Sequence, residues 1–460
     1  MKRLALLLLI LSAFFDLKAQ TPHPPDDSAA CLQNLLRCGK FTGHARLFGM
    51  ATDNSGGLTD YYGVAAGVGL GYVTPAIAGF EAGISGFMIF NLASSDLALR
   101  DSLTGMPNRY EIGLFDIENP HNTTDLDRTE ELFLRWKKGS LASVTVGRFV
   151  PKTPFINPQD GRMRPTLAQG IWVEAGPKEK WRAHAAWLSG FSPRSTVRWF
   201  KTGESIGVYP SGFNPDGSRS DYRGHLESKG VFIAAMEAQL SEGVRLQAWN
   251  HFTENIFNTA WLELSAEHKL ANGATLYAKA QGIRQDALRD GGNPDPAKTY
   301  FEKGGHAEVF GLRLGLREQY RHFNLNYTRI TPSGRYLMPR EWGRDPHYTF
   351  LPRERNEGFG DVHAFSMNAE TTRHGWQYAL GAGYYDLPDA LNARLNKYAM
   401  PSYIQLNVSI RHHFHKMLEG LEGTLLVVHK IGTGNTYEKP GLIFNKVDMT
   451  LFNLVLDYHF

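Results

Sequence analysis

The feature of this sequence that most restricts its fold is a segment of about ten alternating residues, which recurs along nearly the whole chain. In "YIQLNVSIRHHF" (403–414) every second residue from Ile404 to Ile410 is apolar, and in "VFGLRLGLRE" (309–318) every second residue from Phe310 to Leu316 is apolar, while the residues between are polar or glycine. A period of two is typical of a β-strand with two unlike faces. After the first twenty residues there is no run of about eighteen apolar residues, which a membrane-spanning helix needs.

The number of these segments indicates a closed barrel. A closed sheet of about eighteen such strands leaves a lumen too wide for side chains to fill. Its polar face should therefore line water, and its apolar face should meet lipid. Short links such as 137–140 and 241–243 alternate with long links such as 92–128 and 334–361, as in an up-and-down barrel. We therefore predict an all-β fold, a transmembrane antiparallel β-barrel of about 18 strands over residues 41–460. The expected strands start near residues 41, 61, 80, 129, 141, 168, 181, 228, 244, 259, 274, 307, 323, 362, 376, 402, 421 and 447.

The N-terminus has the features of a secretory signal peptide. Lys2 and Arg3 precede an apolar stretch at residues 4–15, and a small-residue cleavage site follows. We expect residues 1–19 to be removed and residues 20–40 to form a periplasmic or lumenal segment before the barrel. Cleavage removes three basic residues and one acidic residue, so the formal net charge falls from +3 by two, to about +1. A nucleic-acid partner is therefore not expected.

The chain has only two cysteines, Cys31 and Cys38, both close to the expected mature N-terminus. An exported protein can form disulfides, so a local bridge and two free thiols both remain open. Two thiolates without a nearby pair of histidines make a poor zinc site. Neither a nucleotide-binding loop nor an EF-hand loop is present, so we predict no metal and no cofactor.

The last strand ends on an apolar stripe that includes Phe452, Leu454 and Phe460. In a barrel this stripe should face lipid, and the last strand should pair with the first. A terminal phenylalanine resembles the signal that ends bacterial outer-membrane proteins. This resemblance implies that the barrel assembly machinery is a partner, together with the lipid and lipopolysaccharide of the outer membrane.

The opposite faces of the strands carry many basic residues. They offer a passing carboxylate successive partners along the wall, but they could equally be ordinary wall charges that pair with acidic residues. Arg148 and Arg284 fall on the lipid-facing set, and we expect them at the rim or redirected by bulges near Gly147 and Gly282. The predicted pore-wall basic residues are His44, Arg46, Arg135, Lys137, Arg182, Arg245, Lys279, Arg313, Arg317, Arg411 and Lys430.

The proline-rich stretch "VTVGRFVPKTPFINPQDGRMRPTLAQGIWVEA" (144–175) resembles the third loop of the OprD family of Gram-negative outer-membrane porins. The resemblance implies eighteen strands around a narrow eyelet, formed by inward-folded third and seventh loops. It makes Arg148, Asp160 and Arg162 candidate eyelet residues, although Asp160 and Arg162 could instead pair to brace the loop. Residues 334–358 are the candidate seventh loop. The matching positions are Gly147, Arg148, Pro151, Pro154, Asp160, Arg162, Pro165 and Gly170.

These observations predict a substrate-selective porin of the bacterial outer membrane, not an enzyme. It should allow passive diffusion of small anionic or zwitterionic solutes such as amino acids, peptides and organic acids. A non-specific diffusion porin remains an alternative, as does an outer-membrane hydrolase, although no convincing nucleophile motif is present. An energy-coupled receptor would need a plug domain and about 22 strands. Both a monomer and a trimer remain open.

Overall fold

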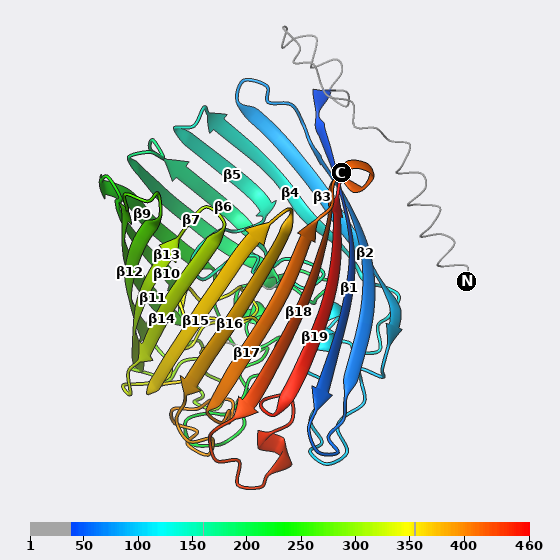
Figure 1. Cartoon of the computed structure of the whole chain (residues 1–460). Coiled ribbons are helices and arrows are strands. Elements are labelled where there is room, and N and C mark those ends of the chain that lie inside the picture. The colour runs from blue at the N-terminus through cyan, green and yellow to red at the C-terminus, as the bar shows by residue number, and fades with distance from the viewer. Residues whose placement is uncertain (1–37, 160, 354–355) are drawn as a thin grey trace.

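The computed structural model describes residues 38–159, 161–353 and 356–460, and its strands form one antiparallel sheet that closes on itself (Figure 1). Each long strand pairs with the next along the chain, and β19 pairs with β1 from His44↔His459 to Asn54↔Met449. Strand β8 has two residues and pairs only with the end of β7, while β9 continues the wall beside β7. The barrel wall therefore has eighteen strands, as predicted.

The strands are β1 (Lys40–Asn54), β2 (Tyr61–Val73), β3 (Phe80–Ser94), β4 (Asp127–Lys138), β5 (Ala142–Phe149), β6 (Leu167–Ala175), β7 (Trp181–Ser192), β8 (Phe200–Lys201), β9 (Val231–Ser241), β10 (Val244–Thr253), β11 (Phe257–Lys269), β12 (Thr275–Ala287), β13 (His306–Arg317), β14 (Arg321–Ile330), β15 (Val362–Arg373), β16 (Trp376–Asp386), β17 (Tyr403–His413), β18 (Leu421–Gly432) and β19 (Met449–His459). A short 3-10 helix, η1 (Glu111–Leu114), lies between β3 and β4. In the described part of the chain, no helix is long and apolar enough to cross a membrane.

Every predicted strand start lies within three residues of the observed one. The largest difference is at β9, which begins at Val231 and not at residue 228. The backbone N–H of Lys229 donates to a carboxylate oxygen of Glu254 (3.0 Å), so this position does not contribute to the strand ladder. The period-two alternation of apolar residues was therefore sufficient to place the strands of the barrel wall in the sequence.

The two faces of the wall differ as their alternation predicts. On β13, Phe310, Leu312 and Leu314 are exposed on the outer face, while Gly311 between them is buried on the inner face. On β19, Phe452 and Leu454 are likewise exposed, so the C-terminal apolar stripe faces outward. Exposed apolar side chains on a continuous closed surface are what a lipid environment requires.

The two ends of the barrel carry different connections. The C-terminus and the short turns share one end, at the top of Figure 1. The other end, at the bottom of Figure 1, carries links that include the third loop (150–166) and the seventh loop (331–361). We call these the short-turn end and the long-loop end.

Apolar residues of the long loops fill the lumen side of the wall. Phe155 and Ile156 of the third loop are fully buried, as is Trp342 of the seventh loop. They belong to one cluster with wall residues, in which the ring of Trp342 stacks on Phe191 of β7 with 4.7 Å between centroids. This packing holds the two loops against the inner wall of the barrel.

Bulges were predicted near Gly147 and Gly282, and the only register shift close to either glycine in the described strand pairs lies between Gln169 and Gly170, in the pairing of β6 with β7 opposite Gly147. The pairing of β5 with β4 and β6 is continuous through Gly147, and that of β12 with β11 and β13 is continuous through Gly282. Arg284 stays on the outer set near the long-loop end, where it bonds Asp286 (2.6 Å) and Glu308. No redirection is needed, because these carboxylates neutralise the guanidinium at the rim.

Arg148 likewise remains on the outer set of β5, near the long-loop end. Its Nε donates to Gln169 Oε1 (3.1 Å), and its guanidinium lies 4.5 Å from the centroid of the Trp199 ring. This position is remote from the inner face, so Arg148 does not share a site with the basic residues of the lumen.

The outer face provides a direct test of membrane placement. Arginine at Leu312, in the middle of β13, should destabilise the folded barrel by about 2–4 kcal/mol, because the charge would lie at the centre of the bilayer. Equilibrium urea titration of the protein folded into phospholipid vesicles measures this loss. The matched control is Leu103→Arg: Leu103 is as exposed as Leu312 (61% against 56%), but it lies in the link between β3 and β4. Equal losses in the two variants would contradict the assignment of the lipid face.

Candidate functional site

The third and seventh loops are joined to each other inside the barrel. The backbone N–H of Asn157 donates to the carbonyl of Trp342 (3.1 Å), and its side-chain amide exchanges hydrogen bonds with the backbone of Arg344 (2.8 and 3.0 Å). Thr166 Oγ1 donates to the carbonyl of Glu341 (2.8 Å). The close approach requires Gly343, whose φ is +154° and where a Cβ would lie 2.6 Å from Asn157 N. These hydrogen bonds fasten the two loops to each other.

The seventh loop crosses the lumen from one wall to the other. Near its start, the backbone of Leu337 exchanges two hydrogen bonds with the amide of Gln285 on β12 (2.6 and 2.9 Å). Near its end, Arg353 donates to Asn453 Oδ1 on β19 (2.9 Å). Because β12 and β19 lie far apart around the barrel, the loop is attached to two separate parts of the wall.

Between these ends, the loop is fastened to the wall by Tyr348. Its hydroxyl donates to Glu263 on β11 (2.6 Å), and its backbone carbonyl accepts from Arg313 on β13 (2.9 Å). Arg313 Nε also donates to Asn326 Oδ1 on β14 (2.5 Å), and its guanidinium lies 4.9 Å from the centroid of the Tyr348 ring. Arg313 thus carries a charge to the place where the loop meets the inner wall, with neutral groups as its hydrogen-bond partners.

The C-terminal part of the third loop brings two buried arginines inward. Arg164 donates to the carbonyls of Phe87 (2.8 Å) and Arg128 (3.0 Å) and forms an ion pair with Glu130, and burial lowers its pKa to about 9. These contacts fix the loop on the wall. Arg162 has a φ of +45°, and its carbonyl accepts a hydrogen bond from the guanidinium of Arg46 on β1.

Arg162 also lies beside η1. A Cβ at Gly113 would stand 3.2 Å from Arg162 Nε. The carboxyl of Glu111 is fully buried and accepts from Asn108 Nδ2 (2.7 Å), and burial raises its pKa although the charge of Arg162 opposes the rise. Asp160 lies outside the described residues, so its predicted pairing with Arg162 stays a prediction. Cys31 and residues 1–37 also lie outside them, whereas Cys38 is half-buried at the start of the described chain.

Acidic residues on neighbouring inner positions accompany most of the predicted pore-wall basic residues. These pairs leave the inner wall with many charged side chains but little net positive charge. This matches the alternative in which the basic residues of the wall pair with acidic residues. Glu81 on β3 pairs with both Arg135 and Lys137 on β4. The pairs are His44–Asp457 (3.0 Å), Arg46–Asp457 (2.6 Å), Arg135–Glu81 (2.9 Å), Lys137–Glu81 (2.8 Å), Arg182–Glu174 (2.7 Å), Arg245–Glu237, Lys279–Glu263 (3.3 Å), Arg317–Glu267 (2.9 Å) and Arg411–Glu422 (3.2 Å).

Lys430 differs from these pairs. It is fully buried, and its ammonium lies 5.1 Å from the centroid of the Tyr403 ring. Together with Arg313, it shows that the inner basic residues have unlike surroundings, which strand periodicity alone does not reveal.

Arg353 of the seventh loop was not among the candidate site residues predicted from the sequence. Its φ is +78°. Its only sequence signal was the high arginine content of that loop.

Lys397 holds several long loops together. Its side chain is 1% exposed, its ammonium donates to the hydroxyl of Tyr222 (3.1 Å), and it lies 4.8 Å from the centroid of the Tyr300 ring. Burial lowers its pKa to about 7, although the charge of Glu357 opposes the shift. These residues come from four different loops, so Lys397 lies where the four loops approach one another.

The pKa of Lys397 predicts the pH dependence of this packing. Between about pH 7 and pH 10.5 the unfolded loops bind a proton that the packed loops do not, so packing should become more stable as pH rises through this window and stay constant below it. Amide-exchange protection factors in residues 387–402 measure this change. Lys397→Met should remove the dependence, and Lys439→Met, at an exposed position in another loop, should keep it. Parallel profiles for wild type and Lys397→Met would refute the assignment.

Comparison with known proteins identifies the fold and the family. The model of the outer membrane porin, OprD family, matches residues 71–342, which is more than half of the chain. Pseudomonas aeruginosa OccK9 (OpdG) has a similar structure, with a TM-score of 0.69 and 12% identity over 92% of this chain and 99% of that chain. Acinetobacter baumannii OccAB4 follows with a TM-score of 0.68 and 16% identity over 92% and 98%, respectively. Pseudomonas aeruginosa OpdK, solved with vanillate, has a TM-score of 0.64 and 12% identity over 92% and 98%. None of the curated proteins compared with this chain matches it.

Proposed function

The chain belongs to the OprD family of outer membrane porins, and from that premise we propose that it is a passive channel selective for small anionic or zwitterionic solutes. It lies in the outer membrane of a Gram-negative bacterium, with its short-turn end toward the periplasm. Amino acids, peptides and organic acids are the solutes that we expect it to pass. No energy source is required, since diffusion down a gradient is sufficient.

The observation that carries this proposal is the crossing of the lumen by the joined third and seventh loops. The Asn157 contacts to Trp342 and Arg344 tie the loops together, and Leu337 and Arg353 fasten them to opposite parts of the wall. An eighteen-stranded barrel without such a partition would leave a wide aqueous channel. With it, a solute must pass close to loop side chains, and contact at short range is what permits selectivity.

The charges at the partition favour anions. Arg162 and Arg353 lie on the two loops, Arg46 contacts the third loop, and Arg313 contacts the seventh. A guanidinium presents paired N–H donors that match the two oxygens of a carboxylate. Salt screens the electric field of these groups only weakly, because they lie in a narrow, partly dry passage. The ion-paired residues of the wider remainder of the lumen, here called the vestibule, are screened by salt.

The structure of OpdK was solved with vanillate, an aromatic carboxylate. At 12% identity, the likeness to OpdK extends to the fold alone, so it gives only a reason to include aromatic carboxylates among the solutes tested. A non-specific diffusion porin is the second candidate. The acidic partners of the wall basic residues favour this alternative, because they reduce the net positive charge of the vestibule.

Single-channel recording in a planar bilayer with a salt gradient tests the proposal. We expect small, anion-preferring conductance that millimolar carboxylates or amino acids reduce. Uncharged sugars of the same size serve as the control and should not reduce it. Large, weakly selective conductance would show instead that the protein is a general diffusion porin.

A further inference from the structure

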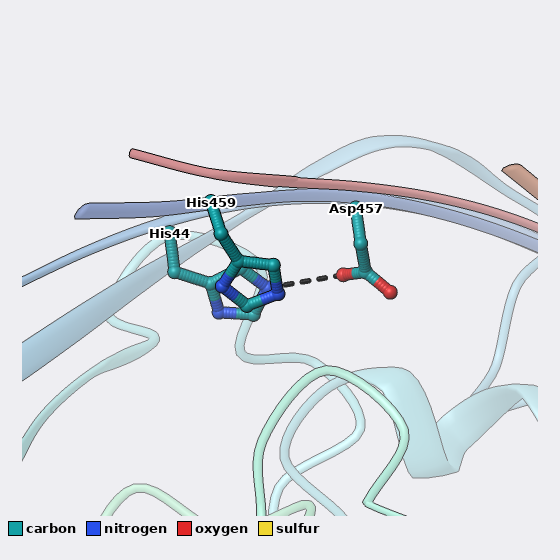
Figure 2. Close-up of side chains that lie close together, drawn as sticks. All are labelled: His44, Asp457 and His459. Carbon is teal, nitrogen blue, oxygen red and sulfur yellow. Dashed lines mark hydrogen bonds and ion pairs between the residues drawn. The ribbon is translucent and has the colours of Figure 1, made fainter. Parts of the chain in front are cut away.

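Three side chains that commonly ligate metals meet at the seam where the last strand closes on the first. His44 of β1 and Asp457 and His459 of β19 each contribute one ligand atom, and all three atoms lie within 4.8 Å of one another. Figure 2 shows the three side chains on the same side of the two strands, with the imidazoles overlapping face to face. They lie on the inner face near the short-turn end, which is the periplasmic mouth.

The strand register explains why these side chains meet. Gly43 and Phe460 exchange both backbone hydrogen bonds (2.8 and 3.1 Å). The next pair, His44 and His459, is therefore a non-hydrogen-bonded pair, in which opposite side chains approach most closely. The rings are nearly parallel (5°), with 4.3 Å between centroids. Asp457 is two residues away on the same face, in the diagonal position within reach of His44.

The carboxylate is held in place by a neighbouring residue. Arg46 donates from Nε to Asp457 Oδ1 (2.6 Å) and from a terminal nitrogen to Oδ2 (3.0 Å). Oδ1 also lies 3.0 Å from His44 Nε2. A hydrogen-bond partner that orients a ligating carboxylate is a regular component of metal sites. Glu422 lies opposite Asp457 on β18, and it pairs with Arg411 (3.2 Å) and His413 (3.1 Å) of β17.

We propose that His44, Asp457 and His459 bind one divalent transition-metal ion, of which Zn²⁺ is the representative, at the periplasmic mouth. Two imidazole nitrogens and one carboxylate oxygen form a borderline ligand set that suits Zn²⁺ and leaves a fourth position open toward the lumen. Mg²⁺ prefers six oxygen ligands and should bind poorly. On binding, the hydrogen bond between His44 and Asp457 is replaced by a bond from each residue to the ion, and the ring proton of each histidine is held on the nitrogen that does not bind the metal.

The site has two consequences for the barrel. Its ligands come from the first and the last strand, so a bound ion would link the two ends of the sheet directly. It would also place a positive ion with an open coordination position next to Arg46. This inference does not depend on which solutes the channel passes, because it rests on the ligand set alone.

Calorimetric titration of the purified protein with Zn²⁺ tests the proposal. The protein should carry no polyhistidine tag and should have Cys31 and Cys38 replaced by serine, so that neither supplies other ligands. We expect one Zn²⁺ per chain. In His459→Ala and in His44→Gln, which each remove a direct ligand, the affinity should fall by more than the about 10–100-fold that loss of a residue supporting a ligand costs. The matched control is His412→Ala, since His412 stacks on Trp376 (4.1 Å between centroids), away from this cluster, and its loss should leave binding unchanged.

Several outcomes would overturn the proposal. Wild-type protein that takes up no Zn²⁺, or Zn²⁺ affinity that is equal in wild type and His459→Ala, excludes a site made by these ligands. Mg²⁺ binding as tight as Zn²⁺ binding would indicate simple charge attraction. His459 is next to the chain end, so His459→Ala should fold even if His44→Gln does not, and a heat-dependent shift of the folded band in gels verifies folding.

Discussion

Replacement of residues 338–357 by a short glycine-serine link should raise the single-channel conductance several-fold and abolish reduction of the current by carboxylates. Tyr336 and Phe359 flank this segment as a bridged pair: the N–H of Tyr336 donates to the carbonyl of Phe359 (2.9 Å). The deletion therefore joins two points that are already neighbours. It removes Arg353 and the contacts of Tyr348 with the wall, and with them the span across the lumen. Planar-bilayer recording measures both effects.

A shortened loop elsewhere controls for general damage to the barrel. The turn at residues 214–218, in which the N–H of Asn214 donates to the carbonyl of Ser218 (2.8 Å), has its exposed part at residues 216–218. Shortening this exposed part is the control and should leave the conductance unchanged. A milder variant, Gly343→Val, drives a side chain into the backbone of Asn157 and should raise the conductance by a smaller amount. Gly224→Val is its control, because Gly224 also has a positive φ (+75°) but has nothing within 4 Å. Unchanged conductance after the large deletion would show that the seventh loop does not limit the pore.

The wall of this barrel could be predicted from the sequence because it depends on a local rule. Side chains alternate between two solvents with a period of two, so a strand such as β17 can be recognised without knowledge of its neighbours. Closure of the sheet at β19 and β1 also followed, since an open edge is not tolerated in lipid. The pairings of β5 and β12 carry no bulge at Gly147 or Gly282 themselves, because a glycine in a strand permits a bulge without requiring one.

The interior could not be predicted in the same way, because it depends on contacts between residues far apart in the chain. The bond between Thr166 and the carbonyl of Glu341 spans 175 positions, and no local pattern in either segment indicates it. The pairing of Glu81 with Arg135 requires the register of β3 against β4, and a bulge near Gly86 shifts that register. The lumenal basic residues could be placed on a face, but their partners could not be assigned.

The second large effect is expected at Arg313. Arg313→Gln should lower the anion-to-cation permeability ratio several-fold, as measured by the reversal potential in a salt gradient. Arg313 is held by Asn326 and by the carbonyl of Tyr348, both neutral, at the place where the seventh loop meets the wall. Its charge is therefore not cancelled by a bonded carboxylate, and the surroundings are partly dry, so screening is weak.

Arg317 on the same strand is the matched control. It also lies on the inner face, but it is exposed in the vestibule and pairs with Glu267 (2.9 Å). Arg317→Gln removes the same formal charge, yet it should change the reversal potential little, because mobile ions screen a charge in the wide vestibule.

Arg313→Lys distinguishes the effect of the positive charge on permeation from the effect of the hydrogen bonds that hold the seventh loop. It keeps the positive charge but loses the planar fork that reaches Asn326 and Tyr348 together. If selectivity survives in Arg313→Lys and falls in Arg313→Gln, the charge itself attracts anions. If both variants lose selectivity and gain conductance, Arg313 acts by holding the seventh loop in place, and the selectivity must then arise from the loop arginines.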